Sequence, residues 1–193
     1  MKTKIFAAIA FMMLGLSLNA NAQRLSYPAF HMGIRGGATL NVDTDRGDPG
    51  AFPTIGIGMD FRVAPIPLYL ETGAFYMNKL VDLGPNHDKD EEDLHHDHYI
   101  YAPLLASYHL YLSDKFCLQP FAGVTLGYLT ESEMVEVAAR VGVGLNFGRL
   151  YSNLGLDVSL TNHEWYDHYS GYTTPSQYVT LFWTIGVNWA GSR

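Results

Sequence analysis

Hydrophobic and polar residues alternate with a period of two along most of this chain. A β-strand points successive side chains to opposite faces of its sheet, so this alternation favours strands over helices. Eight such stretches occur, at residues 29–41, 54–62, 68–78, 99–110, 116–129, 135–147, 150–161 and 177–189. The pattern therefore predicts an all-β chain, and the sequence contains no internal repeat and no sign of a second folded domain.

The connections between these stretches alternate between two kinds. Long and polar connections follow the first, third and seventh stretches, at 42–53, 79–98 and 162–176. Short connections follow the second, fourth and sixth stretches, at 63–67, 111–115 and 148–149. The connection after the fifth stretch is also short, but it carries Glu131 and Glu133. Long loops on one side and tight turns on the other indicate an antiparallel up-and-down meander. An even number of strands allows such a meander to close into a barrel without a free edge.

The alternation divides the strand residues into two stripes of opposite character. One stripe is apolar and carries no charged residue in any of the eight stretches. The other stripe carries Arg35, Arg62, Glu71, Arg140 and Asp157, together with many of the glycines. A water-soluble barrel with an apolar interior would also show two stripes, so the alternation alone does not decide which stripe faces inward.

The composition of the polar stripe decides between these alternatives. A stripe that faces water is usually about a quarter to a third charged, whereas this one has few charges and many glycines, which weaken a solvent-facing strand. In the narrow lumen of an eight-stranded barrel, glycine leaves room for large side chains. Aromatic residues of the apolar stripe gather near the strand ends, as at a membrane interface. We therefore expect an eight-stranded antiparallel up-and-down transmembrane β-barrel, with a soluble exported barrel as the alternative.

The N-terminus has the features of an export signal. Lys2 and Lys4 precede the apolar segment 5–18, and Ala20-Asn21-Ala22 is a small-residue cleavage site. We expect residues 1–22 to be a cleaved signal peptide and residues 23–193 to be the outer-membrane β-barrel domain. The unbroken apolar run is too short to be a membrane-spanning helix.

Cysteine content and net charge exclude other classes of protein. Of the 193 residues only Cys117 is a cysteine, which rules out a disulfide framework and a cysteine-based zinc site. The formal net charge of −7 argues against a nucleic-acid partner. No cofactor is expected.

The second long connection, residues 79–98, is unusually acidic and rich in histidine. It contains seven Asp and Glu residues and four histidines, of which His95, His96 and His98 are closely spaced. Histidine and carboxylate side chains together bind zinc, copper or nickel, so these three histidines are weak metal candidates. Their spacing is not specific for a metal, and we expect a solvated, mobile, acidic loop.

Turn chemistry predicts how the charges of the polar stripe meet. In Phe147-Gly148-Arg149-Leu150, glycine at the first central position suits a two-residue type II′ turn. That turn places Arg140 directly opposite Asp157. Arg62 and Glu71 flank the turn at 65–67 and are expected within reach of each other. Together with Arg35, these residues are expected to form a structural salt-bridge network in the lumen, because the side chains of an eight-stranded barrel fill its interior.

An enzyme of lipid modification needs a nucleophile and a base near the outer surface of the membrane. The Ser/His pair in the strands is Ser107 and His109, which lies beside the short turn 111–115. That is the wrong depth for lipid of the outer leaflet. We interpret the pair as a hydrogen-bonded lumen contact and expect no catalytic residue.

Several segments resemble the PorT-like outer-membrane β-barrel proteins of the Bacteroidota. The resemblance is carried by residues 33–41, 70–76, 102–105, 118–123 and 154–157. It implies an eight-stranded barrel in a diderm outer membrane and supplies no shared catalytic residues. Some members of the family serve a secretion and gliding apparatus.

Three functions follow as hypotheses. The leading one is a non-enzymatic outer-membrane barrel whose extracellular loops contact a partner, ligand or envelope component. The alternative is an accessory barrel of a secretion or envelope-assembly machine, and the third is a lipid-modifying enzyme. The expected partners are outer-membrane lipid and other envelope or secretion proteins.

Overall fold

The computed structural model describes residues 28–43, 49–81, 95–113, 115–161, 163–166, 173–176 and 178–190. The expected signal peptide lies outside these residues. Within the ranges described, no helix has the length and apolarity needed to cross a membrane.

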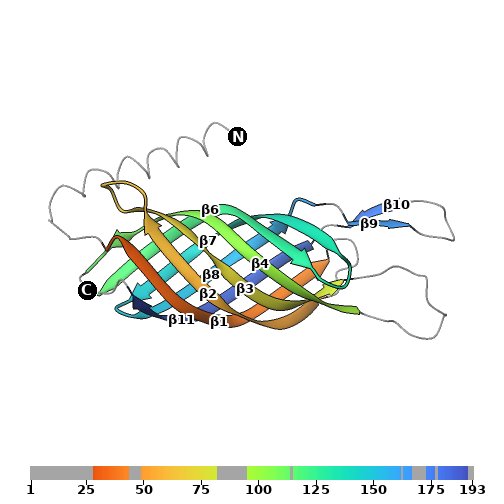
Figure 1. Ribbon diagram of the computed structural model, residues 1–193, viewed down its shortest axis with the longest axis horizontal. Coiled ribbons are helices and arrows are strands. Elements are labelled where there is room, and N and C mark those ends of the chain that lie inside the picture. Colours follow the sequence, from red (N-terminus) through yellow and green to blue (C-terminus); the bar gives the residue numbers. More distant parts are fainter. Residues whose placement is uncertain are drawn as a thin grey trace.

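Eight long strands form a closed antiparallel barrel (Figure 1). They are β1 (Phe30–Asp43), β2 (Pro49–Arg62), β3 (Leu68–Val81), β4 (His95–Tyr108), β6 (Phe116–Leu129), β7 (Met134–Phe147), β8 (Leu150–Ser159) and β11 (Tyr178–Ala190). Each pairs with its neighbours along the chain, β11 pairs with both β1 and β8, and β4 pairs with both β3 and β6. The predicted eight-stranded all-β barrel is confirmed.

Three short strands complete the fold. β5 (Leu110–Tyr111) continues the chain beyond β4 and pairs with β6. β9 (His163–Tyr166) and β10 (Thr173–Ser176) form a separate two-stranded hairpin within the seventh connection. Figure 1 shows this hairpin beyond the end of the barrel that carries the long loops.

The strands beside the first two long loops are longer than the sequence pattern predicted. β1 and β2 reach Asp43 and Pro49, and β3 and β4 reach Val81 and His95. The prediction that all of 79–98 is a solvated loop is therefore wrong at both of its ends, and its middle part, 82–94, lies outside the described residues. Lys79 and Asp97 stand opposite each other in the β3–β4 ladder, and each is only 1% exposed. Their charges suggested a loop, but both side chains point into the barrel.

The two faces of the barrel have the polarity that the composition predicted. Charged residues of the polar stripe are buried, as shown by Arg35 and Glu71, each 2% exposed. Apolar residues of the other stripe are exposed outside, and Trp183 has 53% of its surface accessible. A barrel with an apolar interior and a polar exterior is thereby ruled out for the strands described.

Glycines of the inner stripe give the large lumen side chains their room. A Cβ atom on Gly58 would collide with the Arg35 guanidinium, and one on Gly127 would collide with the Tyr99 ring. A Cβ atom on Gly142 would likewise collide with the Phe121 ring. The interior of an eight-stranded barrel is just wide enough for its side chains. Each of these three side chains therefore fits only because the residue facing it is a glycine without a Cβ atom.

Two adjacent glycines of β1 provide a matched test of this packing. A Cβ on the inward-facing Gly37 would overlap the Trp183 carbonyl oxygen and lie 2.7 Å from Thr184 Cα, whereas one on the outward-facing Gly36 meets its nearest atom at 3.6 Å. We expect Gly37→Ala to lower the free energy of unfolding by about 1–3 kcal/mol, and Gly36→Ala to leave it nearly unchanged. Urea unfolding in lipid vesicles measures both, and equal effects would contradict the packing described.

The β7–β8 turn sets the register of this part of the barrel. Gly148, the first central residue of the turn, has a φ of +62°, and the φ of Arg149 is not positive. A type II′ turn requires this combination. Phe147 pairs with Leu150, and Arg140 pairs with Asp157. The register predicted from the turn residues is the register observed.

Candidate functional site

Arg140 and Asp157 form a two-point ion pair across β7 and β8. Arg140 Nε donates to Asp157 Oδ1 at 2.6 Å, and Arg140 Nη2 donates to Asp157 Oδ2 at 2.5 Å. The guanidinium carbon lies 4.3 Å from the centroid of the Phe182 ring and 5.1 Å from that of Tyr101. The arginine charge is thus neutralised by one carboxylate and enclosed by aromatic rings.

A second charged group lies nearer the short turns. Arg35 Nη1 donates to Glu71, and Arg35 Nη2 donates to Asp60 Oδ1 at 3.1 Å. The Tyr151 hydroxyl donates to Glu71 Oε1 at 2.9 Å, and the Arg35 guanidinium lies 3.9 Å from the centroid of the Tyr151 ring. Four strands contribute to this network, so it ties distant parts of the barrel wall together.

Arg62 and Glu71 lie on the same inner face of the β2–β3 hairpin, as predicted. Asp60 stands opposite Glu71, and Arg62 stands opposite Tyr69, so Arg62 and Glu71 are diagonal neighbours on the same face. The Glu71 carboxylate accepts hydrogen bonds from Arg35 and Tyr151. Arg35 reaches it from β1 over the intervening strand β2, past Gly58, a contact that the geometry of one hairpin alone does not reveal.

A third ion pair lies near the long loops and was missed by the sequence analysis. Lys79 Nζ donates to Glu136 Oε2, and both side chains are buried. The Lys79 ammonium lies 5.1 Å from the ring centroids of both Tyr99 and Tyr178. The signal for Lys79 was the continued alternation of β3, which its position in a charged segment obscured.

Apolar and aromatic side chains close the lumen between the charged groups. Leu105, Phe121 and Phe182 form one buried cluster, and Phe75 and Tyr101 belong to a second. The cavity among these residues and the two arginine groups has a volume of about 10 Å³, which is close to that of a single water molecule. The space between the Arg35 and Arg140 groups is therefore nearly filled by side chains, and these two charged groups do not line an open channel there.

Ser107 and His109 lie together at the short-turn end of the lumen. Ser107 Oγ and His109 Nε2 are 3.3 Å apart, and Gln119 Nε2 lies 3.4 Å from His109 Nδ1. The His109 ring stacks on Tyr69 with 3.7 Å between ring centroids. Ser107, His109 and the neighbouring Cys117 are all buried. The predicted hydrogen-bonded lumen pair is what the structure contains, and a lipid on the outside of the barrel does not reach it.

Asp97 fastens the β6–β7 turn to the long-loop end of the barrel. Its carboxylate accepts hydrogen bonds from the backbone N–H of Glu131 at 2.9 Å, from that of Ser132 at 3.0 Å, and from the Ser132 hydroxyl at 2.7 Å. Glu133 in the same turn has a φ of +51°. The buried acid therefore holds a turn whose backbone includes a left-handed residue.

Replacing Asp97 tests this anchoring role. Asp97→Ala removes the acceptor for two backbone N–H groups, and we expect a local loss of about 1–3 kcal/mol. Amide hydrogen exchange should become faster at Glu131 and Ser132 while β7 and β8 keep their protection. Asp97→Asn, which retains one acceptor oxygen, should lie between the alanine variant and the wild type. Unchanged exchange at Glu131 and Ser132 would contradict the role.

His98 lies outside the barrel at the same rim. Its Nδ1 is 2.7 Å from the Tyr76 hydroxyl and 3.2 Å from Asn78 Oδ1, and its Nε2 is 3.9 Å from Glu131 Oε1. His95 and His96 are the first two residues of β4. Among the residues described, no three potential metal ligands come together, and His98 is held instead in a hydrogen-bonded surface cluster.

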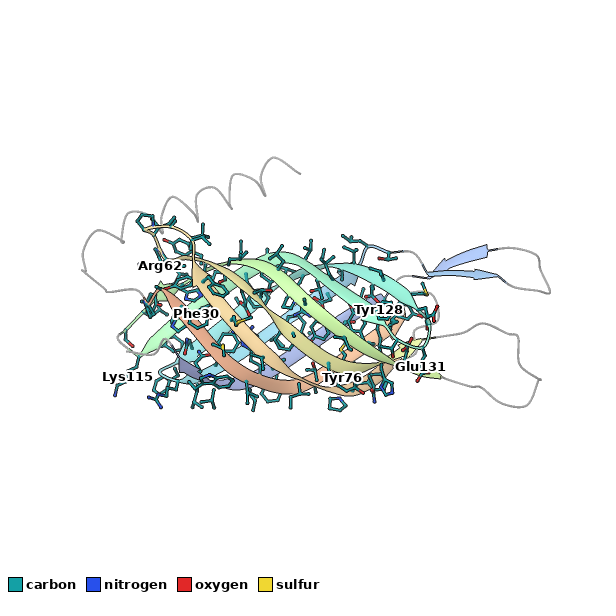
Figure 2. The ribbon with its side chains drawn as sticks, in the orientation of Figure 1. Phe30, Arg62, Tyr76, Lys115, Tyr128 and Glu131 are labelled. Atoms are coloured by element: carbon teal, nitrogen blue, oxygen red, sulfur yellow. The ribbon has the colours of Figure 1, made fainter. Side chains whose placement is uncertain are left out.

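Aromatic residues mark both ends of the apolar band. Figure 2 places Phe30 near the short turns, and it places Tyr76 and Tyr128 near the long loops. Phe61, Phe147 and Trp189 are also exposed on the outer face at the short-turn end. The distribution predicted from the sequence is the one observed.

Comparisons with known proteins find similar structures but no family. No protein-family model and no curated protein matches the chain, so the PorT-like resemblance remains a prediction. Similar solved structures include Neisserial surface protein A (TM-score 0.47, 11% identity, covering 82% of this chain and 96% of that chain). They also include Ail, the attachment invasion locus protein of Yersinia pestis, in complex with the heparin analogue sucrose octasulfate (TM-score 0.46, 10% identity, covering 83% and 99%).

Proposed function

We propose that this chain is a non-enzymatic bacterial outer-membrane barrel whose long-loop end contacts an extracellular partner, ligand or envelope component. The observation that carries the proposal is the inverted polarity of the barrel. Its interior holds buried ion pairs, and its exterior is an uncharged apolar band with aromatic residues at both ends. Exposing such an apolar exterior to water is energetically unfavourable, whereas the hydrocarbon core of a bilayer accommodates it.

The arrangement of the loops orients the proposed barrel. Outer-membrane barrels have short turns on the periplasmic side and longer loops outside the cell. The short turns of this chain, including Gly148-Arg149, are therefore periplasmic. The β9–β10 hairpin lies on the extracellular side, as do the ends of β3 and β4 that the acidic connection joins. The lumen, nearly filled between the Arg35 and Arg140 groups, supports an anchoring role for the barrel and leaves binding to the loop end.

The charge of the loop end limits the kind of partner. Glu131 and Glu133 are exposed there, and the connection at 82–94 carries six acids against one lysine. Opposite charges steer two surfaces together and like charges keep them apart. We therefore expect the partner to present a basic surface rather than a polyanion.

Affinity capture tests the proposal. The tagged protein is lightly crosslinked in intact cells and recovered from detergent-solubilised envelopes. A specific partner should be recovered with the wild type, and less of it with a Glu131→Gln/Glu133→Gln variant. The matched control Lys115→Gln/Arg149→Gln, at the opposite end, should recover the partner as the wild type does. Recovery of the protein in the soluble fraction would contradict the membrane location.

Two further outcomes would redirect the proposal. Recovery of components of a secretion or assembly machine would favour the accessory-barrel alternative. An altered lipid A mass spectrum after deletion of the gene would favour a lipid-modifying enzyme. The buried position of Ser107 and His109 leads us to expect an unchanged spectrum.

A further inference from the structure

The two rims of the barrel carry opposite charges. Among the residues described, the exposed charged side chains at the short-turn end are Lys115 and Arg149, and those at the long-loop end are Glu131 and Glu133. Figure 2 places Lys115 and Glu131 at opposite ends of the molecule. The sequence also has Asp114 beside Lys115. The half-buried Arg62 adds a further positive charge at the short-turn end, so basic residues outnumber acidic ones there.

Lys115 and Arg149 occupy one continuous arc of the short-turn rim. The Lys115 carbonyl accepts a hydrogen bond from the Gly148 N–H at 2.8 Å, so its turn lies directly beside the β7–β8 turn. The Arg149 carbonyl accepts one from the Asn188 N–H, also at 2.8 Å. The two cations are therefore carried by adjoining segments, next to the end of β11.

Large apolar side chains lie just below these cations on the outer face. Phe147 and Leu150 flank the turn that contains Arg149, and each is 59% exposed. Trp189, on β11, is 46% exposed. Aromatic side chains of this kind sit at the boundary between hydrocarbon and headgroups, and basic residues next to them extend into the headgroup layer.

We propose that this arc binds the phosphate groups of anionic phospholipids in the leaflet on the short-turn side. The inference rests on the membrane location proposed above and adds a lipid class and a leaflet to it. A basic residue is stabilised near an anionic membrane surface, and the apolar side chains fix the depth at which Lys115 and Arg149 meet that surface. The acidic loop rim repels the same lipids, so the preference belongs to one end.

Trp189 is a built-in reporter of lipid at this arc. A Trp165→Phe/Trp183→Phe variant leaves Trp189 as the remaining tryptophan, and it is reconstituted in phosphatidylcholine vesicles that contain a brominated lipid quencher. We expect brominated phosphatidylglycerol to quench Trp189 more strongly than brominated phosphatidylcholine at the same mole fraction. The association constant of phosphatidylglycerol relative to phosphatidylcholine should be about 2–5, because Lys115 and Arg149 attract the anionic headgroup while the neighbouring Asp114 opposes one of these charges.

Variants and salt separate the proposed contact from general membrane binding. Lys115→Gln/Arg149→Gln should bring the relative constant to about 1, and Glu131→Gln/Glu133→Gln should leave it unchanged. High salt should remove the preference from the wild-type rim, which tests the charges without any substitution. Equal quenching of Trp189 by the two lipids would overturn the inference, whereas no quenching by either lipid would overturn the membrane proposal on which it rests.

Discussion

Asp157→Ala is expected to lower the free energy of unfolding by about 3–5 kcal/mol, the usual cost of breaking a buried ion pair. Arg140 is 8% exposed and gives two hydrogen bonds to the Asp157 carboxylate. Without that carboxylate, the guanidinium stays in the lumen between the Tyr101 and Phe182 rings with its charge uncompensated. Urea unfolding in lipid vesicles measures the loss.

A double substitution distinguishes the loss of a partner from the loss of packing. Arg140→Met/Asp157→Leu removes both charges and keeps most of the volume, so it should be milder than Asp157→Ala alone. A single variant with wild-type stability, or a double variant as unstable as the single one, would contradict the role of the pair.

Leu156→Arg is expected to cost about 2–4 kcal/mol, because it places a charge in the middle of the apolar band. Leu156 stands opposite Val141 in the β7–β8 ladder and is exposed on the outer face. Leu150→Arg is the matched control, since the same substitution beside the turn lies near the interface and should cost about 0–1 kcal/mol. Equal costs at the two positions, or a Leu156→Arg protein that is stable and soluble in water, would contradict a lipid-facing band.

Local chemistry made much of the barrel predictable from the sequence. The period of two identified the eight long strands, and the glycines of one stripe identified the lumen. Gly148 fixed the β7–β8 register, which brought Arg140 opposite Asp157. Each of these inferences depends on residues that are close in the chain or joined by one tight turn.

Contacts across the lumen were not predictable in the same way. Arg35 reaches Asp60 on β2 and Glu71 on β3, so these contacts depend on the registers of two successive hairpins taken together. Tyr151, on β8, meets Glu71 only because the barrel closes. Lys79 and Asp97 were assigned to a loop because their neighbours are polar, yet the barrel wall continues through them. The β9 and β10 strands are four residues each, too short for alternation to be recognised.

Spin-label accessibility tests the central claim, that the outer face of the barrel meets lipid hydrocarbon. Labels at positions 156 and 141, in a Cys117→Ser background in lipid vesicles, should collide often with oxygen and rarely with a water-soluble nickel complex. A label at position 150, near the short-turn rim, should show the opposite balance. Frequent collisions with the nickel complex at positions 156 and 141 would mean that water covers this face, which would contradict the account.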